Sequence, residues 1–121
     1  MILIAEDDKN FGYVLKNELE AENYAVDLAT DGVEAILKFL DGGYDVLLFD
    51  VKMPRLNGVS AVKIIKKIAP EIPVVLFSGN ADSEISSEIA GIDAALFLSK
   101  PFEIEKLKDA IRRYSSTGSN G

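Results

Sequence analysis

The residues best suited to chemistry in this sequence are polar side chains that directly follow short apolar runs. Four of these runs end at residues 5, 49, 77 and 98. The polar residues that follow them are Glu6, Asp7, Asp8, Asp50, Ser78, Ser99 and Lys100. In a parallel α/β sheet the carboxyl ends of the strands share one edge, and ligands bind in the crevice along it. If the runs are strands of such a sheet, we expect these polar groups to converge.

Three of these residues, Glu6, Asp7 and Asp50, would then bring like charges together. At a separation of about 5 Å, each pair of carboxylates repels by roughly 3 kcal/mol at an effective dielectric constant near 20. Lys100 alone cannot neutralise three carboxylates, so either some bind protons at a raised pKa or a divalent cation binds. Mg²⁺ suits a small set of carboxylates, because it keeps part of its water shell and completes it with phosphate oxygens. The cluster therefore indicates phosphate chemistry.

This chemistry suggests a role for each group. Asp50 is the candidate nucleophile, because a carboxylate can accept a phosphoryl group as an acyl phosphate. Glu6 and Asp7 would hold the metal ion. Lys100 would balance charge on the transferred group, and the Ser78 hydroxyl could donate to a phosphoryl oxygen, since phosphoryl transfer depends mostly on positioning and electrostatics.

Each residue also has an ordinary structural explanation when it is taken alone. Asp8 is better explained as the cap of the first helix. Asp50 could simply begin a loop, Ser78 could belong to a turn, and Lys100 could be a solvated lysine. Pro101 could merely start the last helix. The joint pattern, with polar groups at the same end of successive runs, favours the functional interpretation.

The elements that must position these residues are short apolar runs that alternate with helical patterns. The runs span residues 2–5, 25–29, 45–49, 73–77 and 94–98. Four are almost wholly apolar, as expected of strands covered by helices on both faces. The run at 25–29 differs, because Asp27 interrupts it and predicts a strand at the edge of the sheet. Together the alternating segments predict an α/β fold with a parallel sheet.

Between the runs the apolar period changes from two to 3.6, which predicts amphipathic helices. The sets that carry the first three helices are Phe11, Val14, Leu15 and Leu19; Val33, Ile36, Leu37 and Leu40; and Ala61, Ile64, Ile65 and Ile68. The pattern is weaker at residues 82–92, which predicts a short or mobile fourth helix. A fifth helix is predicted to end near Tyr114. The polar segment 115–121 is expected to form a flexible tail or the start of a linker.

The composition limits the classes of function. The chain has 121 residues, which fits one domain, and its apolar runs are too short to span a bilayer. It has no cysteine and no leader-like segment, which predicts a cytoplasmic location. Its net charge of −7 opposes direct binding to nucleic acids or anionic membranes. Without histidine, Ser-His-Asp triads and most zinc sites are excluded.

The sequence resembles the receiver domains of two-component response regulators over residues 1 to about 114. The resemblance rests on Glu6-Asp7, Asp50 with the MPRLNG that ends at Gly58, Ser78, and Lys100-Pro101-Phe102. It implies a flavodoxin-like (βα)5 fold, a three-layer sandwich around a parallel five-stranded sheet of order 2-1-3-4-5. This order agrees with the edge strand predicted at residues 25–29.

The resemblance also implies a biochemical role. Asp50 would accept a phosphoryl group from a phosphohistidine of a sensor histidine kinase or a histidine phosphotransfer protein. Mg²⁺, with Mn²⁺ as a substitute, would bind to Glu6, Asp7, Asp50 and the main-chain carbonyl of Lys52. The Lys100-Pro101 bond would be cis. The domain would hydrolyse its own acyl phosphate slowly and would not turn over other substrates.

A switch is the next implication of the resemblance. Ser78 would move toward the phosphoryl group and Phe97 would turn inward behind it, which would change the surface around the fourth helix and fifth strand. Phe97 has the ordinary alternative of a core residue. The family associates the positions of Ser78 and Lys52 with switching and with the lifetime of the phosphoryl group. The signal would pass to an output domain or to a separate downstream protein.

Three other functions use a similar fold or similar chemistry. A phosphohydrolase of the haloacid dehalogenase type would need a second Asp two residues after Asp50, where Lys52 stands. A flavin carrier of the same fold would need a phosphate-binding loop after the first strand, where Glu6, Asp7 and Asp8 repel phosphate. A receiver-like binding module that is not phosphorylated remains an open alternative.

Overall fold

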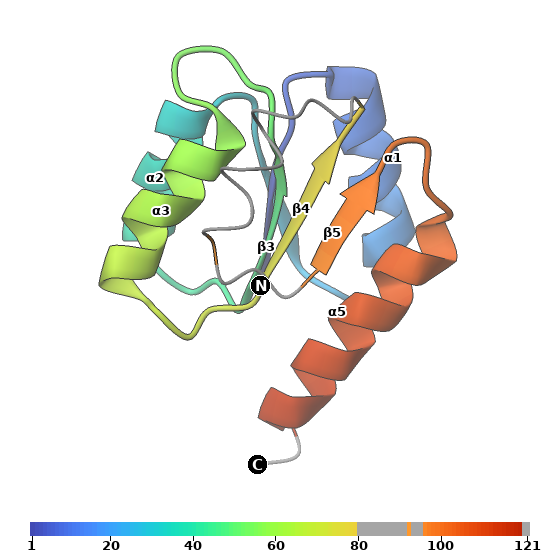
Figure 1. Ribbon diagram of the computed structural model, residues 1–121. Coiled ribbons are helices and arrows are strands. Elements are labelled where there is room, and N and C mark those ends of the chain that lie inside the picture. The colour runs from blue at the N-terminus through green and yellow to red at the C-terminus, as the bar shows by residue number, and fades with distance from the viewer. Residues whose placement is uncertain (80–91, 93–95, 120–121) are drawn as a thin grey trace.

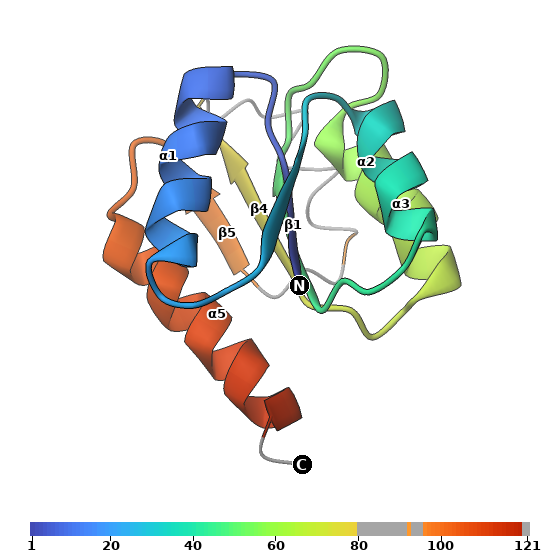
Figure 2. The ribbon, with the colours of Figure 1, turned by 180° about the vertical axis from the view of Figure 1, so that it is seen from behind.

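Five parallel strands form the centre of the fold, and helices cover both faces of the sheet (Figures 1 and 2). The structure, a computed structural model, describes residues 1–79, 92 and 96–119. The strands are β1 (Ile2–Ala5), β2 (Val26–Ala29), β3 (Val46–Asp50), β4 (Val74–Ser78) and β5 (Leu96–Ser99). The described helices are α1 (Lys9–Glu20), α2 (Gly32–Leu40), α3 (Gly58–Ile68) and α5 (Ile104–Ser119). The predicted helix at 82–92 lies outside the described residues, apart from Ile92.

The strand order is β2-β1-β3-β4-β5, so the flavodoxin-like order expected from the sequence is confirmed. β2 lies at one edge, as the interruption of its apolar run by Asp27 predicted. In the register of the sheet, Asp50 pairs with Phe77 and Ser78 pairs with Ser99. Asp50 and Ser78 are therefore the last residues of their strands, so each of these strands ends one residue later than predicted.

Two apolar cores lie on opposite faces of the sheet. Alternate strand residues point to opposite faces, so each strand contributes to both cores. Leu47 and Phe49 pack on the side covered by α2 and α3, while Val46 and Leu48 pack on the side of α1 and α5. The central strands β1, β3 and β4 are buried along their whole length. This burial on both faces explains their uninterrupted apolar sequences.

Side chains of Asp and Asn fix the starts of three helices. Asp8 accepts hydrogen bonds from the main-chain N–H groups of Asn10 (3.0 Å) and Phe11 (3.2 Å), which confirms its predicted role as a helix cap. Asp31 caps α2 and Asn57 caps α3 in the same way. These caps set where each helix leaves the carboxyl edge of the sheet.

The fifth strand and fifth helix differ from the prediction. β5 is the second edge of the sheet, and its residues alternate between covered and exposed positions. Phe97 is 40% exposed, so the alternative reading of it as an ordinary core residue is wrong. The helix α5 continues to Ser119, five residues beyond the predicted end. Serine and threonine lower helix propensity only slightly, so the loss of apolar periodicity after Tyr114 did not mark a stop.

Three helices carry a wider apolar stripe than the cores can cover. The sequence placed Val14, Leu37, Leu40, Ile64 and Ile68 on core-facing stripes, but these side chains are 54%, 60%, 57%, 41% and 56% exposed, respectively. Ile65 is buried, as predicted for the inner face of α3. No helix in the described part of the chain is long and apolar enough to cross a membrane.

Candidate functional site

The carboxylates of Glu6, Asp7 and Asp50 meet at the carboxyl edge of the sheet. One oxygen of each lies within 4.8 Å of one oxygen of both others. Glu6 directly follows β1 and Asp50 ends the neighbouring strand β3, so the pairing of these strands brings the two side chains together. Glu6 and Asp50 are only 2% and 5% exposed, whereas Asp7 is exposed. The convergence expected from the sequence is present for all three carboxylates.

Lys100 joins the two buried carboxylates. Its Nζ donates to Oε1 of Glu6 at 2.6 Å and to Oδ2 of Asp50 at 2.8 Å. Burial lowers the pKa of Lys100, but the hydrogen bonds to Asp50 and Glu6 outweigh burial and raise the pKa above its ordinary value. Lys100 is therefore a permanent cation at this edge, and one positive charge faces two buried acidic groups.

The pKa of Glu6 reflects this excess of buried acidic groups over positive charge. Burial, the largest cause, and the nearby Asp50 together raise the pKa of Glu6 from 4.5 to about 7, against the opposing hydrogen bond from Lys100. The main-chain N–H of Asp8 also donates to Glu6, at 3.1 Å. A proton or a cation can therefore relieve the repulsion between Glu6 and Asp50.

Aromatic rings support the ammonium group of Lys100. Its Nζ lies 4.6 Å from the ring centroid of Phe11 and 5.4 Å from that of Phe77. Phe102 completes a cluster in which the three ring centroids are 5.8–6.1 Å apart. The sequence pattern predicts Phe11 in a helical stripe and Phe77 in a strand, but it does not predict their contact with Lys100. Only the position of Phe77, directly before Ser78, pointed to the site.

The loop after β3 is fixed against Asp50. The main-chain N–H of Lys52 donates to Oδ1 of Asp50 at 3.0 Å, which leaves the Lys52 carbonyl as a further oxygen of this loop. Gly58 closes the loop, because its N–H donates to the carbonyl of Val51 at 2.8 Å. A Cβ on Gly58 would lie 2.0 Å from the main-chain oxygen of Asp50. Only glycine allows α3 to start this close to the site.

The loop makes a second contact that the sequence pattern did not predict. Arg55 donates to Oδ2 of Asp31 through Nη2 at 2.6 Å and through Nε at 3.0 Å. The N–H of Glu34 and this guanidinium hold the pKa of Asp31 below its ordinary value. The ion pair ties the loop of the site to the start of α2. Arg55 has a φ of 65°, a left-handed conformation that sequence patterns do not reveal for arginine.

Ser78 and Lys100 are joined through the main chain. Ser78 is 2% exposed at the end of β4, and its carbonyl accepts a hydrogen bond from the N–H of Lys100 at 2.7 Å. The Lys100-Pro101 peptide bond is cis. Phe97 lies on β5 two residues before Ser99, the residue that pairs with Ser78. The predicted residues on β4 and β5 therefore lie beside one another at the carboxyl edge.

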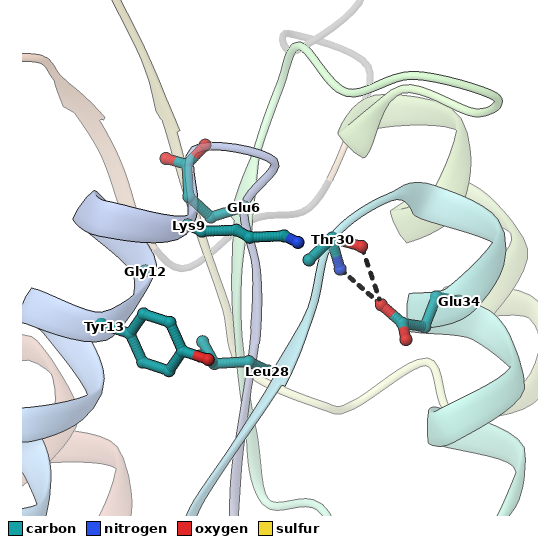
Figure 3. Close-up of a pocket in the computed structure, with 7 residues that line it drawn as sticks. All are labelled: Glu6, Lys9, Gly12, Tyr13, Leu28, Thr30 and Glu34. Atoms are coloured by element: carbon teal, nitrogen blue, oxygen red, sulfur yellow. Dashed lines mark hydrogen bonds between the residues drawn. The ribbon is translucent and has the colours of Figure 1, made fainter.

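A pocket of about 350 Å³ lies next to the acidic cluster, between α1 and the start of α2 (Figure 3). Leu28 and Gly12 form its apolar side, and Glu6 separates it from the site. Lys9 extends toward Thr30, whose N–H and hydroxyl donate to Oε1 of Glu34 at 2.6 and 3.2 Å. Glu34 thus caps the segment that starts α2.

The donor set of the acidic cluster fits a hard divalent cation. It consists of the carboxylate oxygens of Glu6, Asp7 and Asp50, and it holds more negative charge than Lys100 neutralises. Mg²⁺ prefers such oxygen ligands and keeps several waters. The carboxylates present therefore match the kind of ion that the sequence predicted.

Comparison with known proteins points to a single family. The family model for the response regulator receiver domain matches residues 2–112. The uncharacterized transcriptional regulatory protein YkoG of Bacillus subtilis is 36% identical over 113 residues, which cover 92% of this chain and 49% of that protein. The response regulator ArlR of Staphylococcus saprophyticus is 35% identical over 113 residues, 92% of this chain and 50% of that protein. The chain spans about half the length of these curated relatives.

Solved structures resemble the chain over nearly its whole length. The receiver domain of the Francisella response regulator 1452 is 33% identical with a TM-score of 0.81, covering 96% of this chain and 97% of that one. The response regulator TrrA of Thermotoga maritima, solved in complex with Mg²⁺-BeF, is 28% identical with a TM-score of 0.83, covering 93% and 96%. A CheY-like receiver domain protein of Methanospirillum hungatei is 26% identical with a TM-score of 0.90, covering 99% and 97%.

Proposed function

Because the chain belongs to the family of response regulator receiver domains, we propose that Asp50 is its phosphoacceptor and that phosphorylation switches a protein-binding surface. The phosphoryl group would come from a phosphohistidine of a sensor histidine kinase or phosphotransfer protein. The bond between phosphorus and the donor nitrogen breaks as the bond to an Asp50 oxygen forms. These 121 residues contain no histidine, so they cannot supply the phosphohistidine donor themselves.

The observation that carries this proposal is the bridging of Glu6 and Asp50 by Lys100. A carboxylate is a weak nucleophile toward a phosphoryl group that itself carries negative charge, so the approach requires cationic groups already in place. Lys100 holds Oδ2 of Asp50 at 2.8 Å and sits over aromatic rings, which limits its movement. The same ammonium would remain beside the phosphoryl oxygens after transfer. Ser78, at the end of the adjacent strand, would donate to one of these oxygens.

The charge of the incoming group also has to be balanced from the acidic side of the site. Glu6, Asp7, Asp50 and the carbonyl of Lys52 would hold Mg²⁺, which offsets the charge of the phosphoryl group and orients it. The position of the Lys52 carbonyl depends on the loop that Gly58 and the pair of Arg55 with Asp31 hold in place. Two of the carboxylates are buried in a fixed geometry, so little reorganisation is needed when the donor arrives.

The switch would be carried by Ser78 and Phe97. Ser78 is buried at the site, and Phe97 is 40% exposed on the edge strand β5, so an inward movement would bury its ring. With no hydroxyl on Phe97, such movement would act through packing. The chain spans about half the length of its relatives, so an output domain or a separate docking protein downstream is part of the proposal. Slow hydrolysis of the acyl phosphate would reset the switch.

The test is intact-mass measurement after incubation with Mg²⁺ and a small acyl-phosphate donor. We expect the mass of one phosphoryl group to be added, and the addition to be lost on chelation or in Asp50→Asn. The matched control is Asp41→Asn, which changes an exposed aspartate at the end of α2 and should leave the addition intact.

Three outcomes would redirect the assignment. A stable phosphoryl adduct on Asp50→Asn would place the acceptor elsewhere. No adduct from either a small donor or a phosphorylated kinase domain would favour the receiver-like binding module that is not phosphorylated. Rapid multiple turnover of unrelated phosphate esters would instead indicate a phosphohydrolase.

A further inference from the structure

Four apolar side chains on α2 and α3 lie outside the cores of the fold. Leu37 and Leu40 are 60% and 57% exposed, and Ile64 and Ile68 are 41% and 56% exposed. None of the four belongs to either core cluster of the described residues. We call these four residues the α2–α3 patch. Single exposed apolar side chains are common on protein surfaces, so the spatial relation of the four decides what they mean.

In α3, the patch residues lie on the flank that faces α2. Successive residues of a helix turn clockwise by about 100° when it is viewed from its N-terminus. From this view Ile64 and Ile68 lie counterclockwise of the buried face formed by Ala61, Val62 and Ile65. The right-handed crossover between parallel strands places α2 on this counterclockwise side of α3. Figures 1 and 2 show the two helices side by side on one face of the sheet.

In α2, the same reasoning places the patch residues on the opposing flank. Leu37 and Leu40 lie clockwise of buried Ala35, toward α3 and solvent. The starts of the two helices are also held close together, because a Cβ on Gly32 would lie 2.0 Å from the main-chain oxygen of Leu56, just before α3. The two helical arrangements therefore place the four residues as an apolar strip along the outer side of the α2–α3 pair.

The charge beside the strip is positive in an otherwise acidic chain. The chain carries a net charge of −7, but α3 contains three lysines and no acidic residue. Lys63 and Lys67 are exposed on its outer side, four residues apart, and Lys67 follows Ile64 by three residues. Within the described residues neither lysine takes part in an ion pair or hydrogen bond. Unpaired lysines next to an apolar strip favour a partner that is apolar in the middle and acidic at the side.

We propose that the α2–α3 patch is a docking surface for an acidic amphipathic helix of a partner protein. The partner helix would lay apolar residues, spaced three and four apart, along the strip and place carboxylates beside Lys63 and Lys67. Four half-exposed side chains fall well short of the roughly 800 Å² per partner that a stable self-associating interface needs. A single helix fits this size better than a second copy of the chain. The surface lies apart from Asp50, so this inference does not depend on phosphorylation.

The probe is a fluorescent, helix-stabilised peptide of about 15 residues, with leucines at helical spacing and glutamates elsewhere. We expect saturable binding by anisotropy, and binding at least about tenfold weaker for a matched peptide with lysines in place of the glutamates. Leu37→Gln combined with Ile64→Gln should weaken binding by about tenfold or more. Lys63→Glu combined with Lys67→Glu should reverse the preference between the two peptides.

The control is Tyr13→Gln combined with Val14→Gln, which changes two exposed apolar residues of α1 on the other face of the sheet. This variant should bind the acidic peptide as tightly as the wild type. Circular dichroism and urea unfolding verify that each variant is folded, and Leu37→Gln alone replaces the double variant if the latter is not. Equal binding of both peptides, or equal loss in the α1 variant, would overturn the proposal. Self-association that requires the patch in sedimentation velocity would overturn the partner helix in favour of a second copy.

Discussion

Two clusters in this domain are each built on one lysine, yet they differ in what they leave unsatisfied. The site cluster consists of Lys100, Glu6 and Asp50, and the edge cluster of Lys38, Asp27 and Tyr44. In the edge cluster the Nζ of Lys38 donates to Asp27 at 3.1 Å, and the hydroxyl of Tyr44 donates to the other oxygen at 2.8 Å. One cation meets one carboxylate there, at a partly exposed edge strand.

The pKa values of Asp27 and Glu6 move in opposite directions. At Asp27 burial raises the pKa, but the hydrogen bonds from Tyr44, Lys38 and the N–H of Leu28 together outweigh burial and lower the pKa. At Glu6 burial dominates, and it raises the pKa to about 7 although Lys100 donates to the same carboxylate. The difference shows that one lysine offsets the charge of one partly exposed carboxylate but not the charge of two buried carboxylates. The site cluster therefore keeps excess negative charge, which a proton or a cation can relieve.

Removing the lysine from each cluster tests this comparison most strongly. Lys100→Met leaves two buried carboxylates without their cation, and breaking such a buried arrangement typically costs about 3–5 kcal/mol. We expect a loss of this size in the free energy of unfolding, measured by urea at pH 8 in EDTA. Because Glu6 can bind a proton, the loss should be smaller at pH 5. Mg²⁺ should recover part of the loss at pH 8.

The matched change is Lys38→Met in the edge cluster. The side chains of Lys38 and Asp27 are 32% and 40% exposed, and exposed ion pairs contribute about 1 kcal/mol or less. Equal losses for the two variants, at either pH, would contradict the claim that burial and the second carboxylate separate the clusters.

The titration of Glu6 gives the next largest effect. Its pKa in the metal-free folded protein is raised from 4.5 to about 7, so the folded state binds this proton more tightly than the unfolded state. The stability that Glu6 contributes is then full below pH 4.5 and is lost as the pH rises through 7. At about 1.4 kcal/mol per pH unit, the loss is at most about 3.5 kcal/mol.

The measurement is the free energy of unfolding from pH 5 to pH 8 in EDTA, for the wild type and Glu6→Gln. The variant should lack this decrease and should be the more stable protein at pH 8. An exposed glutamate changed in Glu71→Gln serves as the control and should follow the wild type. Parallel curves for Glu6→Gln and the wild type would mean that the raised pKa does not govern stability.

Much of this comparison could be predicted from the sequence, because it depends on strand ends and charge. The runs before Glu6, Asp50 and Lys100 identified the strands, and the shared edge of a parallel sheet predicted that the carboxylates meet. Asp27 marked an edge strand, because a charged residue interrupts an apolar run only where one side is open to water. These signals are local in sequence and are read by simple rules of geometry.

The missed features depend on loop conformation and on how much surface a neighbour covers. The contact of Arg55 with Asp31 requires a left-handed φ at Arg55, and the hydroxyl of Tyr44 reaches Asp27 across 17 residues of chain. The apolar pattern in the sequence is also the same whether or not a neighbouring element covers the side chain. The exposure of Phe97 at an edge and of Leu37 beside α3 could therefore not be predicted from periodicity alone.

The smallest predicted effect comes from the neutral member of the edge cluster. Tyr44→Phe removes one hydrogen bond to the Asp27 carboxylate and keeps the ring, so we expect a loss of about 1 kcal/mol in the free energy of unfolding. Burial and the Asp27 carboxylate raise the pKa of Tyr44 to about 12. In an absorbance titration of tyrosine ionisation, the variant should therefore lack the ionisation step of Tyr44, the tyrosine with the raised pKa. Asp27→Asn should instead allow Tyr44 to ionise at a lower pH. If Tyr44 still ionises at the same pH in Asp27→Asn, the hydrogen bond to Asp27 does not stabilise this cluster. The contrast between Asp27 and the buried carboxylates beside Lys100 would then depend on burial alone.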